Sequence, residues 1–531
     1  MNNLRYIILQ LLLVCLPMMA DNKVEIKMLP GEHWWGLATG LGKNMPFVEL
    51  DHFDLMTQNQ TNQSAPLLIS DMGRYIWSDQ PFRVVIKDGT ILLNSDYERI
   101  QVEQAGKTLR EAFLNACCKH FPPSGKLPDT LFFSRPQFNT WIELSTHQNQ
   151  KGILDYARNI VKNGLPHGVI MIDDTWAKYY GNFEFKPELF PNPKAMVDEL
   201  HAMGYKVMLW VSPFVSPDSP ECYDLFRKGF LIKDKTDKWN FYPALGKWWN
   251  GQSAMFDFSN PGAVDYFLSQ LHGLQKKYGI DGFKFDAADN HYYTSPNLSF
   301  YKPSTAVDHN RYWSIKIGRN FAFNELRSSW NTAGEPLVQR LCDKAATWDA
   351  LPQLISEMTA AGILGYAYTC PDMIGGGQWG SFYGDNAEKL DHEMVVRSAQ
   401  IHAMMPMMQF SVAPWRVLTP NEFDVVRQAA ELHVKMSDYI LKCARHAAAT
   451  GEPIVRLMEY QFPHQGFADC RDQYMLGDRY LVTPMVNKGF SRKIVLPKGT
   501  WKDERGKKFK GGRTYVIDVP LNRIPYFEKV R

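Results

Sequence analysis

Between about residue 132 and residue 449, apolar strand-like segments alternate with amphipathic helix-like segments. The strand-like segments recur at separations of roughly 30 to 50 residues, which is typical of repeated strand–helix units. Such units form a parallel sheet, and eight of them close into a barrel. The sequence therefore predicts an α/β fold with a (β/α)8 TIM barrel, and helices such as 192–203 and 261–278 between its strands. The eight expected strands are 139–144, 168–174, 206–213, 279–290, 322–328, 337–343, 362–369 and 404–410.

Two β-rich segments flank the expected barrel. Before it, VEIKML, GRYIWSD and FRVVIKDGTILLNSD are strand-like, with a hairpin turn at 87–90 and one helix at 108–120. After a helix at 421–446, short apolar segments separated by Gly and Pro return. The later strands are expected at 474–484, 492–496, 500–501, 514–519 and 524–527. We therefore expect an N-terminal β-rich domain at 21–131, the barrel at 132–449 and a C-terminal all-β domain at 450–531.

The first twenty residues have the order of a secretory signal peptide. Arg5 precedes a short apolar run that ends at Leu16, and Ala20 lies just before polar residues. This run is too short to span a membrane. We therefore expect a signal peptide at 1–20 and an exported protein, periplasmic or secreted. Cys15 leaves a lipoprotein as the alternative, although Val14 stands where a lipidation motif has a small residue.

Charge and cysteine content argue against several function classes. A net charge of +3 over 531 residues gives no electrostatic reason to expect nucleic acid or an anionic membrane as a partner. The cysteines beyond the signal peptide have no repeated spacing, and the 14 histidines form no metal-binding pattern. We expect no disulfide framework, metal or cofactor. The 15 Trp and 24 Tyr suit a sugar ligand, whose apolar faces stack on rings, although most such rings pack in cores.

Charged or aromatic residues lie at or near the end of almost every expected barrel strand. The carboxyl ends of parallel strands meet at one rim of a barrel, where such barrels carry their chemistry. Polar groups gathered there cost free energy unless they bind or react with something. This rim is therefore the expected functional site. Its residues are Glu143, Asp173, Asp174, Trp210, Asp286, Arg327, Arg340, Asp343 and Asp372.

The stretch 279–290, GIDGFKFDAADN, carries the strongest candidate. Lys284 and Asp286 alternate with two phenylalanines and so share one face of the strand, where the lysine would keep the carboxylate ionised. The structural alternative is an aspartate that caps the following loop. Asp286 and Asp343, on strands four and six of one rim, form the pair that glycoside hydrolysis requires. One attacks or stabilises the anomeric carbon, and the other protonates the leaving oxygen.

In its motifs the chain resembles glycoside hydrolase family 31, in particular the subgroup around the myogenesis-regulating glycosidase, whose members resemble α-galactosidases. The likeness rests on FKFDAAD (283–289) and on RLCDK (340–344) followed by Thr347-Trp348. Asp289 departs from the glutamate common in the subgroup, which could alter contacts to a sugar hydroxyl, and Cys342 departs from glycine. Supporting matches are GRYIWSD (73–79), IDDTW (172–176), LWVSPF (209–214), KWWNG (247–251), PDMIGGG (371–377), GEPIVR (451–456), DQYMLGDRYLVTP (472–484) and IPYF (524–527).

The resemblance implies roles for these residues. Asp286 would be the nucleophile and Asp343 the acid/base, held protonated near the working pH by a less polar setting and a neighbouring anion. Several of the remaining positions have a structural alternative: Asp173 and Asp174 could both be purely structural, the arginines could pair with carboxylates, the tryptophans could pack in the core, and Asp372 could form a tight loop with its glycines. Expected to bind or orient the sugar are Asp173, Asp174, Lys284, Asp289, Arg327, Arg340, Trp141, Trp210, Trp249 and Asp372.

The expected activity is that of a retaining, exo-acting α-glycosidase. Terminal α-galactosides are the expected substrates, cleaved through a covalent glycosyl-enzyme. Two alternatives stay open: an α-glucosidase or α-xylosidase of the same family, and a catalytically inactive carbohydrate-binding relative. The expected partner is an oligosaccharide or glycoside, with no nucleic acid and no membrane span.

Overall fold

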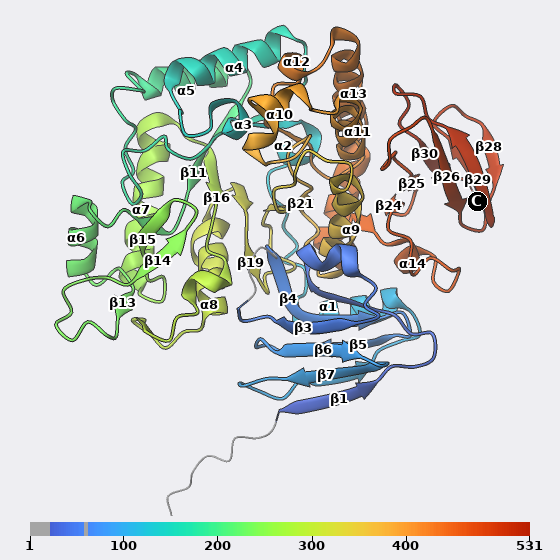
Figure 1. Ribbon diagram of the computed structural model, residues 1–531, viewed down its shortest axis with the longest axis horizontal. Coiled ribbons are helices and arrows are strands. Elements are labelled where there is room, and N and C mark those ends of the chain that lie inside the picture. Colours follow the sequence, from blue (N-terminus) through green and yellow to red (C-terminus); the bar gives the residue numbers. More distant parts are fainter. Residues whose placement is uncertain (1–21, 58–61, 531) are drawn as a thin grey trace, which may run out of the picture.

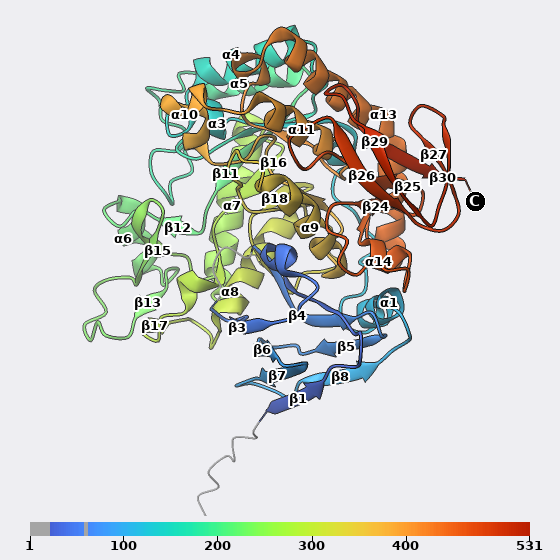
Figure 2. The same cartoon turned by 45° about the vertical axis from the view of Figure 1, so that its right-hand side comes forward.

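The structure is a computed structural model that describes residues 22–57 and 62–530. The expected signal peptide at 1–20, including Cys15, lies outside these residues. No helix in the described ranges is long and apolar enough to cross a membrane. Figure 1 shows β-sheets formed by the N-terminal segment (blue) below a central barrel, and a C-terminal β-sheet region (red) at its side; Figure 2 shows the same arrangement turned by 45°.

Eight parallel strands form the centre of the molecule, in the order β21-β20-β18-β16-β11-β10-β9-β22. A parallel bridge between Met373, which follows β21, and Gln409 in β22 closes the sheet into a barrel. The predicted barrel is thus confirmed. Its strands are β9 (Gln137–Asn139), β10 (Val169–Ile172), β11 (Lys206–Val211), β16 (Gly282–Phe285), β18 (Phe323–Leu326), β20 (Gln339–Arg340), β21 (Thr369–Cys370) and β22 (Gln409–Phe410).

Helices follow most of the barrel strands. The helix predicted at 261–278 is confirmed without change: Pro261 occupies its first turn, the Asn260 side chain accepts a hydrogen bond from the Gly262 N–H, and Gly279 ends it in the left-handed conformation. The outer helices are α4 (Gln150–Lys162), α5 (Pro193–Ala202), α7 (Pro261–Tyr278), α8 (Ala306–Tyr312), α9 (Ala350–Ile363), α11 (His392–His402) and α13 (Pro420–Thr450).

The first expected strand, 139–144, is wrong over most of its length. β9 ends at Asn139, and Trp141–Leu144 forms the short helix α3. The Asn139 side chain accepts a hydrogen bond from the Trp141 N–H at 2.8 Å, which turns the chain out of the strand. The apolar alternation of this segment therefore belongs to a turn and a helix that cover the rim.

The expected strands 362–369 and 404–410 are also mostly wrong. Helix α9 continues to Ile363, and Gly365 ends it with a φ of 81°. The Tyr366 N–H bonds to Ala361 O and the Gly365 N–H to Gly362 O, which is a Schellman motif. Strand seven is therefore only β21, and strand eight only β22. The five other strands lie within their expected ranges but are shorter.

The N-terminal segment forms two sheets, and one of them reaches the barrel. Asp88 and Gly89 have positive φ in the β6–β7 turn, which confirms the predicted hairpin. Between β18 and β20 the chain contains β19 (Ser329–Trp330), which pairs in parallel with β4 of the second sheet. The rim of the barrel thus continues into this sheet. The remaining elements are β1 (Lys23–Lys27), β2 (Trp34–Ala38), β3 (Leu50–Asp54), β4 (Gln63–Ser70), β5 (Arg74–Trp77), β6 (Arg83–Lys87), β7 (Thr90–Asn94), β8 (Gln101–Gln104) and α1 (Leu109–His120).

Further β-structure follows β11 and forms the C-terminal part of the chain. After β11, a hairpin of β14 (Leu245–Trp248) and β15 (Gly251–Met255) pairs with β12 (Phe214–Val215), and its turn at Trp249 and Asn250 points to the rim. The C-terminal residues form strands near the expected positions, but the segment 474–484 is divided into two strands, and the strands at 455–456 and 508–510 were not expected. The C-terminal strands are β23 (Val455–Arg456), β24 (Tyr474–Leu476), β25 (Tyr480–Val482), β26 (Ser491–Leu496), β27 (Thr500–Asp503), β28 (Lys508–Lys510), β29 (Arg513–Asp518) and β30 (Tyr526–Lys529).

Candidate active site

Asp286 follows β16 directly and is buried at the rim. Its Oδ2 accepts a hydrogen bond from the Trp210 indole at 2.7 Å, and its Oδ1 accepts one from the Ala287 N–H at 2.8 Å. Ala287 and Ala288 both have positive φ, so the backbone turns sharply where the carboxyl group is presented. Burial alone would raise the pKa of Asp286, but the charges of Lys284 and Arg327, with others, lower it below its usual value. Asp286 is therefore an anion in the unliganded site.

Lys284 lies on the same face of β16 but pairs with a different carboxylate from the one expected. Its Nζ lies 2.7 Å from Asp173 Oδ2, and both side chains are almost fully buried. Burial lowers the pKa of Lys284, and the charges of Asp173 and Asp286 outweigh that effect and raise it. Lys284 thus neutralises Asp173 by contact and acts on Asp286 only through its field.

Asp174, the next residue along the rim, is held by neutral donors. Its Oδ2 accepts hydrogen bonds from the Tyr180 hydroxyl at 3.0 Å and from the Asn250 amide at 2.9 Å. Burial and the charge of Asp173 raise the pKa of Asp174 to about 7. Near neutral pH this carboxyl group can therefore either donate or accept a hydrogen bond. A cavity of about 250 Å³ opens beside Asp174 and Trp210, but neither Asp286 nor Asp343 lines it.

Arg327, beyond the end of β18, lies between two carboxylates. Its Nε is 3.7 Å from Asp286 Oδ1 and 3.4 Å from Asp289 Oδ2. The guanidinium also lies 5.1 Å from the centre of the Trp249 ring, which is 48% exposed. Arg327 therefore lies between the nucleophile candidate and an indole that is open to solvent.

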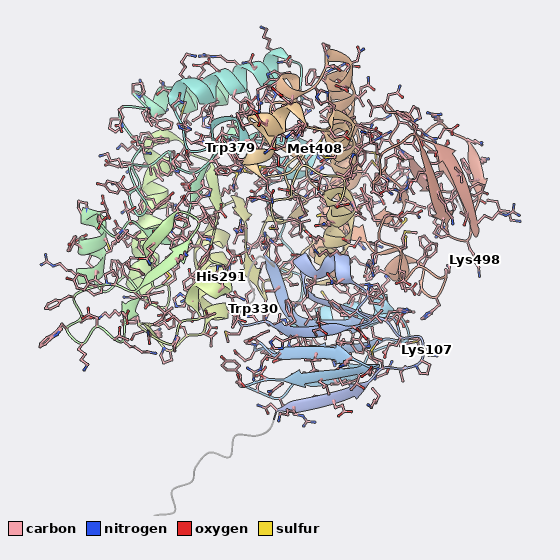
Figure 3. The ribbon with its side chains drawn as sticks, in the orientation of Figure 1. Lys107, His291, Trp330, Trp379, Met408 and Lys498 are labelled. Carbon is pink, nitrogen blue, oxygen red and sulfur yellow. The ribbon has the colours of Figure 1, made fainter. Side chains whose placement is uncertain are left out.

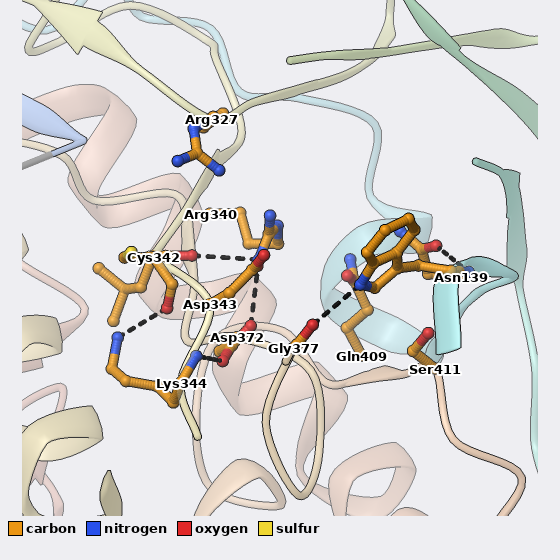
Figure 4. A network of polar contacts seen from close by, with 12 residues as sticks. Asn139, Arg327, Arg340, Cys342, Asp343, Lys344, Asp372, Gly377, Gln409 and Ser411 are labelled. Atoms are coloured by element: carbon orange, nitrogen blue, oxygen red, sulfur yellow. Dashed lines mark hydrogen bonds and ion pairs between the residues drawn. The ribbon is translucent and has the colours of Figure 1, made fainter. Parts of the chain in front are cut away.

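Asp343 lies on the same rim, beside Arg340 of β20. Nη1 of Arg340 donates to Asp343 Oδ1 at 2.6 Å and to Asp372 Oδ1 at 3.0 Å, as Figure 4 shows. Burial raises the pKa of Asp343, but the Arg340 charge, with Arg327 and Lys284, lowers it below its usual value. The expectation that Asp343 is held protonated is therefore wrong for the unliganded site, because this arginine contacts the carboxylate directly.

Asp372 differs from Asp343 in its exposure. It is fully buried, and its Oδ2 accepts a hydrogen bond from the Lys344 N–H at 2.8 Å. Burial and the charge of Asp343 raise the pKa of Asp372 to about 7. The side chain of Asp343, in contrast, is 32% exposed. Of these two carboxyl groups, Asp343 is the one that a ligand can reach.

The structure brings all twelve expected residues to one rim, although several have no free surface. Trp210 is buried and bonded to Asp286, whereas Trp141 is partly exposed and donates its indole N–H to Gly377 O at 2.9 Å. The side chains of Lys284, Asp173 and Arg340 are also nearly inaccessible. These groups orient other side chains, whereas Asp343 and Trp249 keep a large part of their surface open, and Asp286 is buried with only 9% of its side chain exposed.

Sequence reasoning missed three residues that support the site. Gln63 of β4 donates its amide to Arg327 O and to Arg340 O, each at 2.9 Å. Glu325 of β18 is buried beneath the rim, 3.6 Å from Arg340 Nε. Glu325 could have been found because it alternates with Arg327 on one face of the strand. Asn250 lies within the quoted motif KWWNG, whereas nothing in the local sequence marks Gln63.

Two carboxyl groups on the carboxyl-end rim of a (β/α)8 barrel are an arrangement typical of glycoside hydrolases. The model described as the glycosyl hydrolases family 31 TIM-barrel domain matches residues 134–443, and the family 31 C-terminal domain matches residues 451–530. The chain belongs to glycoside hydrolase family 31.

The chain is similar to curated relatives with several activities. It is 30% identical to the myogenesis-regulating glycosidase of Mus musculus over 77% of this chain and 58% of the relative. It is 23% identical to an α-xylosidase of Emericella nidulans over 94% of this chain and 66% of the relative. The chain thus spans about three fifths to two thirds of the length of these relatives.

Solved structures show the same fold. A family 31 dextranase of Flavobacterium johnsoniae, in complex with glucose, aligns with a TM-score of 0.81 at 20% identity over 96% of this chain and 66% of that chain. A family 31 α-xylosidase from a soil metagenome, in complex with xylose, aligns with a TM-score of 0.79 at 22% identity over 96% of this chain and 79% of that chain.

Proposed function

We propose that the protein is a retaining, exo-acting α-glycosidase, with Asp286 as nucleophile and Asp343 as general acid/base. The observation that carries this proposal is the pair of carboxyl groups at one rim of a family 31 barrel. Asp286 is ionised and fixed by Trp210, and Asp343 is partly exposed beside Arg340. The charge of Arg327 acts on both carboxylates, which supports their placement around one substrate.

In the first step, an Asp286 oxygen attacks the anomeric carbon and forms a bond to it. The glycosidic bond breaks, and the Asp343 proton moves to the leaving oxygen. In the second step, a water molecule gives a proton to Asp343 and its oxygen attacks the same carbon. This releases Asp286 as a carboxylate and the sugar with its original configuration.

Asp343 needs a proton at the start of this cycle. We attribute it to the pair that Asp343 forms with Asp372, since both carboxyl groups share one nitrogen of Arg340 and Asp372 has a pKa of about 7. Groups coupled this closely gain and lose protons as a pair. A bound sugar also excludes water from Asp343, which raises the pKa of its carboxyl group.

The preferred substrate in this proposal is a terminal α-galactoside. The likeness of FKFDAAD and RLCDK to the α-galactosidase-like subgroup supports it. Galactose and glucose differ in the orientation of O4, and a buried partner left unpaired by the wrong epimer costs about 1–3 kcal/mol. Of the two expected candidates, Asp174 suits that partner better, because it lines the cavity and can serve as donor or acceptor near neutral pH, whereas Asp173 is paired with Lys284 and nearly inaccessible.

A panel of nitrophenyl α-galactoside, α-glucoside and α-xyloside tests this proposal. We expect the highest kcat/KM for the α-galactoside and, by NMR, the α-anomer as first product. The α-xylosidases among the relatives make the α-xyloside the second candidate. Activity on xyloside or glucoside alone would overturn only the galactoside preference, whereas an inverted first product would overturn the mechanism. Failure to hydrolyse any glycoside would favour an inactive carbohydrate-binding relative.

We also propose that the protein is exported, to the periplasm or the medium, because residues 1–20 have the order of a signal peptide. N-terminal sequencing of protein from the native host should find a start near Asp21. Full-length protein that begins at Met1 in the cytoplasm would contradict this.

A further inference from the structure

The loop between β21 and α11 lies directly against the Asp343 carboxyl group. A Cβ atom added to Gly377 in this loop would lie 2.7 Å from both Cγ and Oδ1 of Asp343, so a side chain here would have to displace that carboxyl group. The carbonyl of the same glycine accepts the hydrogen bond from the Trp141 indole. Figure 4 shows Gly377 beside Asp343 and Asp372. The glycine thus lets one segment of backbone approach the carboxyl group and fix an indole near it.

Trp379 lies two residues further along this loop, and its ring stacks on Tyr383. The ring centroids are 4.6 Å apart and the ring planes differ by 22°. Although Tyr383 backs the indole in this way, 38% of Trp379 stays exposed. Figure 3 labels Trp379 near the position of α10 (Asp385–Glu388) in Figure 1. An aromatic ring that packs against another ring and is still partly exposed to solvent suits the binding of a flat, partly apolar ligand.

Helix α3 contacts Tyr383, the residue that backs the Trp379 ring. The Tyr383 hydroxyl donates to Ile142 O at 2.6 Å, and the Arg416 guanidinium lies 4.9 Å from the centre of the Tyr383 ring. Arg416 in turn pairs with Glu143 at 2.7 Å. Together with the bond from the α3 indole to Gly377, these contacts make α3 and the Gly377–Tyr383 loop one unit around Asp343.

We propose that Trp379, backed by Tyr383, is the stacking platform for a sugar ring in the leaving group. This inference rests on the proposed function. In this proposal Asp343 protonates the oxygen of the leaving group, and the exposed ring on the loop beside Asp343 contacts that group, while Asp286 and Arg327 contact the sugar that is attacked. The apolar C–H face of a sugar ring stacks on an indole. The substrates are therefore di- or oligosaccharides with a sugar on the reducing side of the cleaved bond.

Two substrates that share one glycosyl group test the platform. An α-galactosyl fluoride has no ring in its leaving group, and an α-galactosyl disaccharide has a sugar ring there. If the panel above selects another sugar, its fluoride and disaccharide are used. In Trp379→Ala we expect kcat/KM for the disaccharide to fall about tenfold, mainly through KM, because one aromatic stacking contact is lost. For the fluoride, kcat/KM of Trp379→Ala should stay within about twofold of the wild-type value. Trp379→Phe, which keeps an aromatic ring, should recover most of the wild-type kcat/KM for the disaccharide.

The control variant is Trp239→Ala. Trp239 is 78% exposed on the loop between β13 (Lys233–Asp234) and β14. Trp239→Ala therefore removes an exposed indole, as Trp379→Ala does, but from a different loop. Equal losses for fluoride and disaccharide in Trp379→Ala, or the same disaccharide loss in Trp239→Ala, would overturn the platform while the proposed function stands. A wild-type protein that hydrolyses no glycosyl fluoride would overturn the proposed function and the platform with it.

Discussion

The two carboxyl groups of the site are held in different ways. Asp286 accepts hydrogen bonds from two neutral N–H groups, and the nearest cationic atom, Nε of Arg327, lies 3.7 Å away. Asp343 contacts Nη1 of Arg340 at 2.6 Å, and Asp372 shares that nitrogen. A group that must stay ionised can be stabilised by charge spread over several residues. A group that must exchange a proton in each cycle benefits from a partner that titrates with it.

Asp286→Asn tests the role of Asp286 as the carboxylate that stays ionised and attacks the sugar. The amide has nearly the same volume but cannot form the glycosyl ester, so we expect kcat to fall by roughly four to six orders of magnitude. Initial rates on a nitrophenyl glycoside, with the melting temperature as folding control, measure the effect. A well-folded variant with a loss below a hundredfold would contradict the role of Asp286.

Asp343→Asn tests the role of Asp343 as the group that exchanges a proton in each cycle. Without a proton donor, kcat/KM should fall about 10²- to 10⁴-fold for a substrate with a poor leaving group. A glycosyl fluoride or dinitrophenyl glycoside needs little protonation and should lose much less in its first step. Rates over a series of leaving groups with different pKa check this, and an equal loss across the series would exclude Asp343 as the acid.

Asp372→Asn sharpens the comparison, because it removes the partner of Asp343 and keeps its shape. The two carboxyl groups together retain one proton up to about pH 7, and without Asp372 that proton can reside only on Asp343, whose pKa Arg340 lowers. The alkaline limb of kcat/KM should therefore move to lower pH, by roughly one unit. Asp289→Asn, beside Arg327, is the matched change on the Asp286 side and should move this limb less. A shift to higher pH would contradict the coupling.

Of these variants, Asp174→Asn should have the smallest effect, which is a change in the pH dependence of the stability of the folded protein. The pKa of Asp174 is raised to about 7 in the folded protein, above the value of an unfolded chain, so between about pH 4 and 7 the folded state binds more protons and loses stability as pH rises. The variant lacks this loss. Its melting temperature relative to wild type should increase from pH 5 to pH 8 in thermal unfolding, and a decrease over that range would contradict the raised pKa.

The barrel and its nucleophile candidate could be predicted because their signals are local. Alternation in β16 places Lys284 and Asp286 on one face, and caps such as Asn260 and Gly279 mark the helix ends. The same reasoning failed for 139–144 and 362–369. There, an asparagine turn and a glycine that ends a helix decide the structure, while apolar patterning favoured a strand.

The charge state of the site could not be read from the sequence, because it depends on which groups meet in space. Lys284 pairs with Asp173, which follows β10 and lies 111 positions earlier in the chain. Arg340 lowers the pKa of Asp343, although the resemblance implied a protonated acid. Trp379 has no sequence signal either, since its exposure and its backing by Tyr383 follow from the packing of α3 against a distant loop.

The hydrogen bonds of Gln63 join parts of the chain that are synthesised at different times, which affects the order in which the protein folds. Gln63 leaves the ribosome long before Arg327 and Arg340, whose carbonyl groups lie 264 and 277 positions further on. Until β19 is made, the edge of β4 that will receive it has no partner from the barrel. Contacts of such long sequence separation form slowly, since a long loop must close first. We therefore expect the rim that carries both arginines to be completed late in folding, and a barrel expressed without the N-terminal sheet would lack the amide that bonds to it.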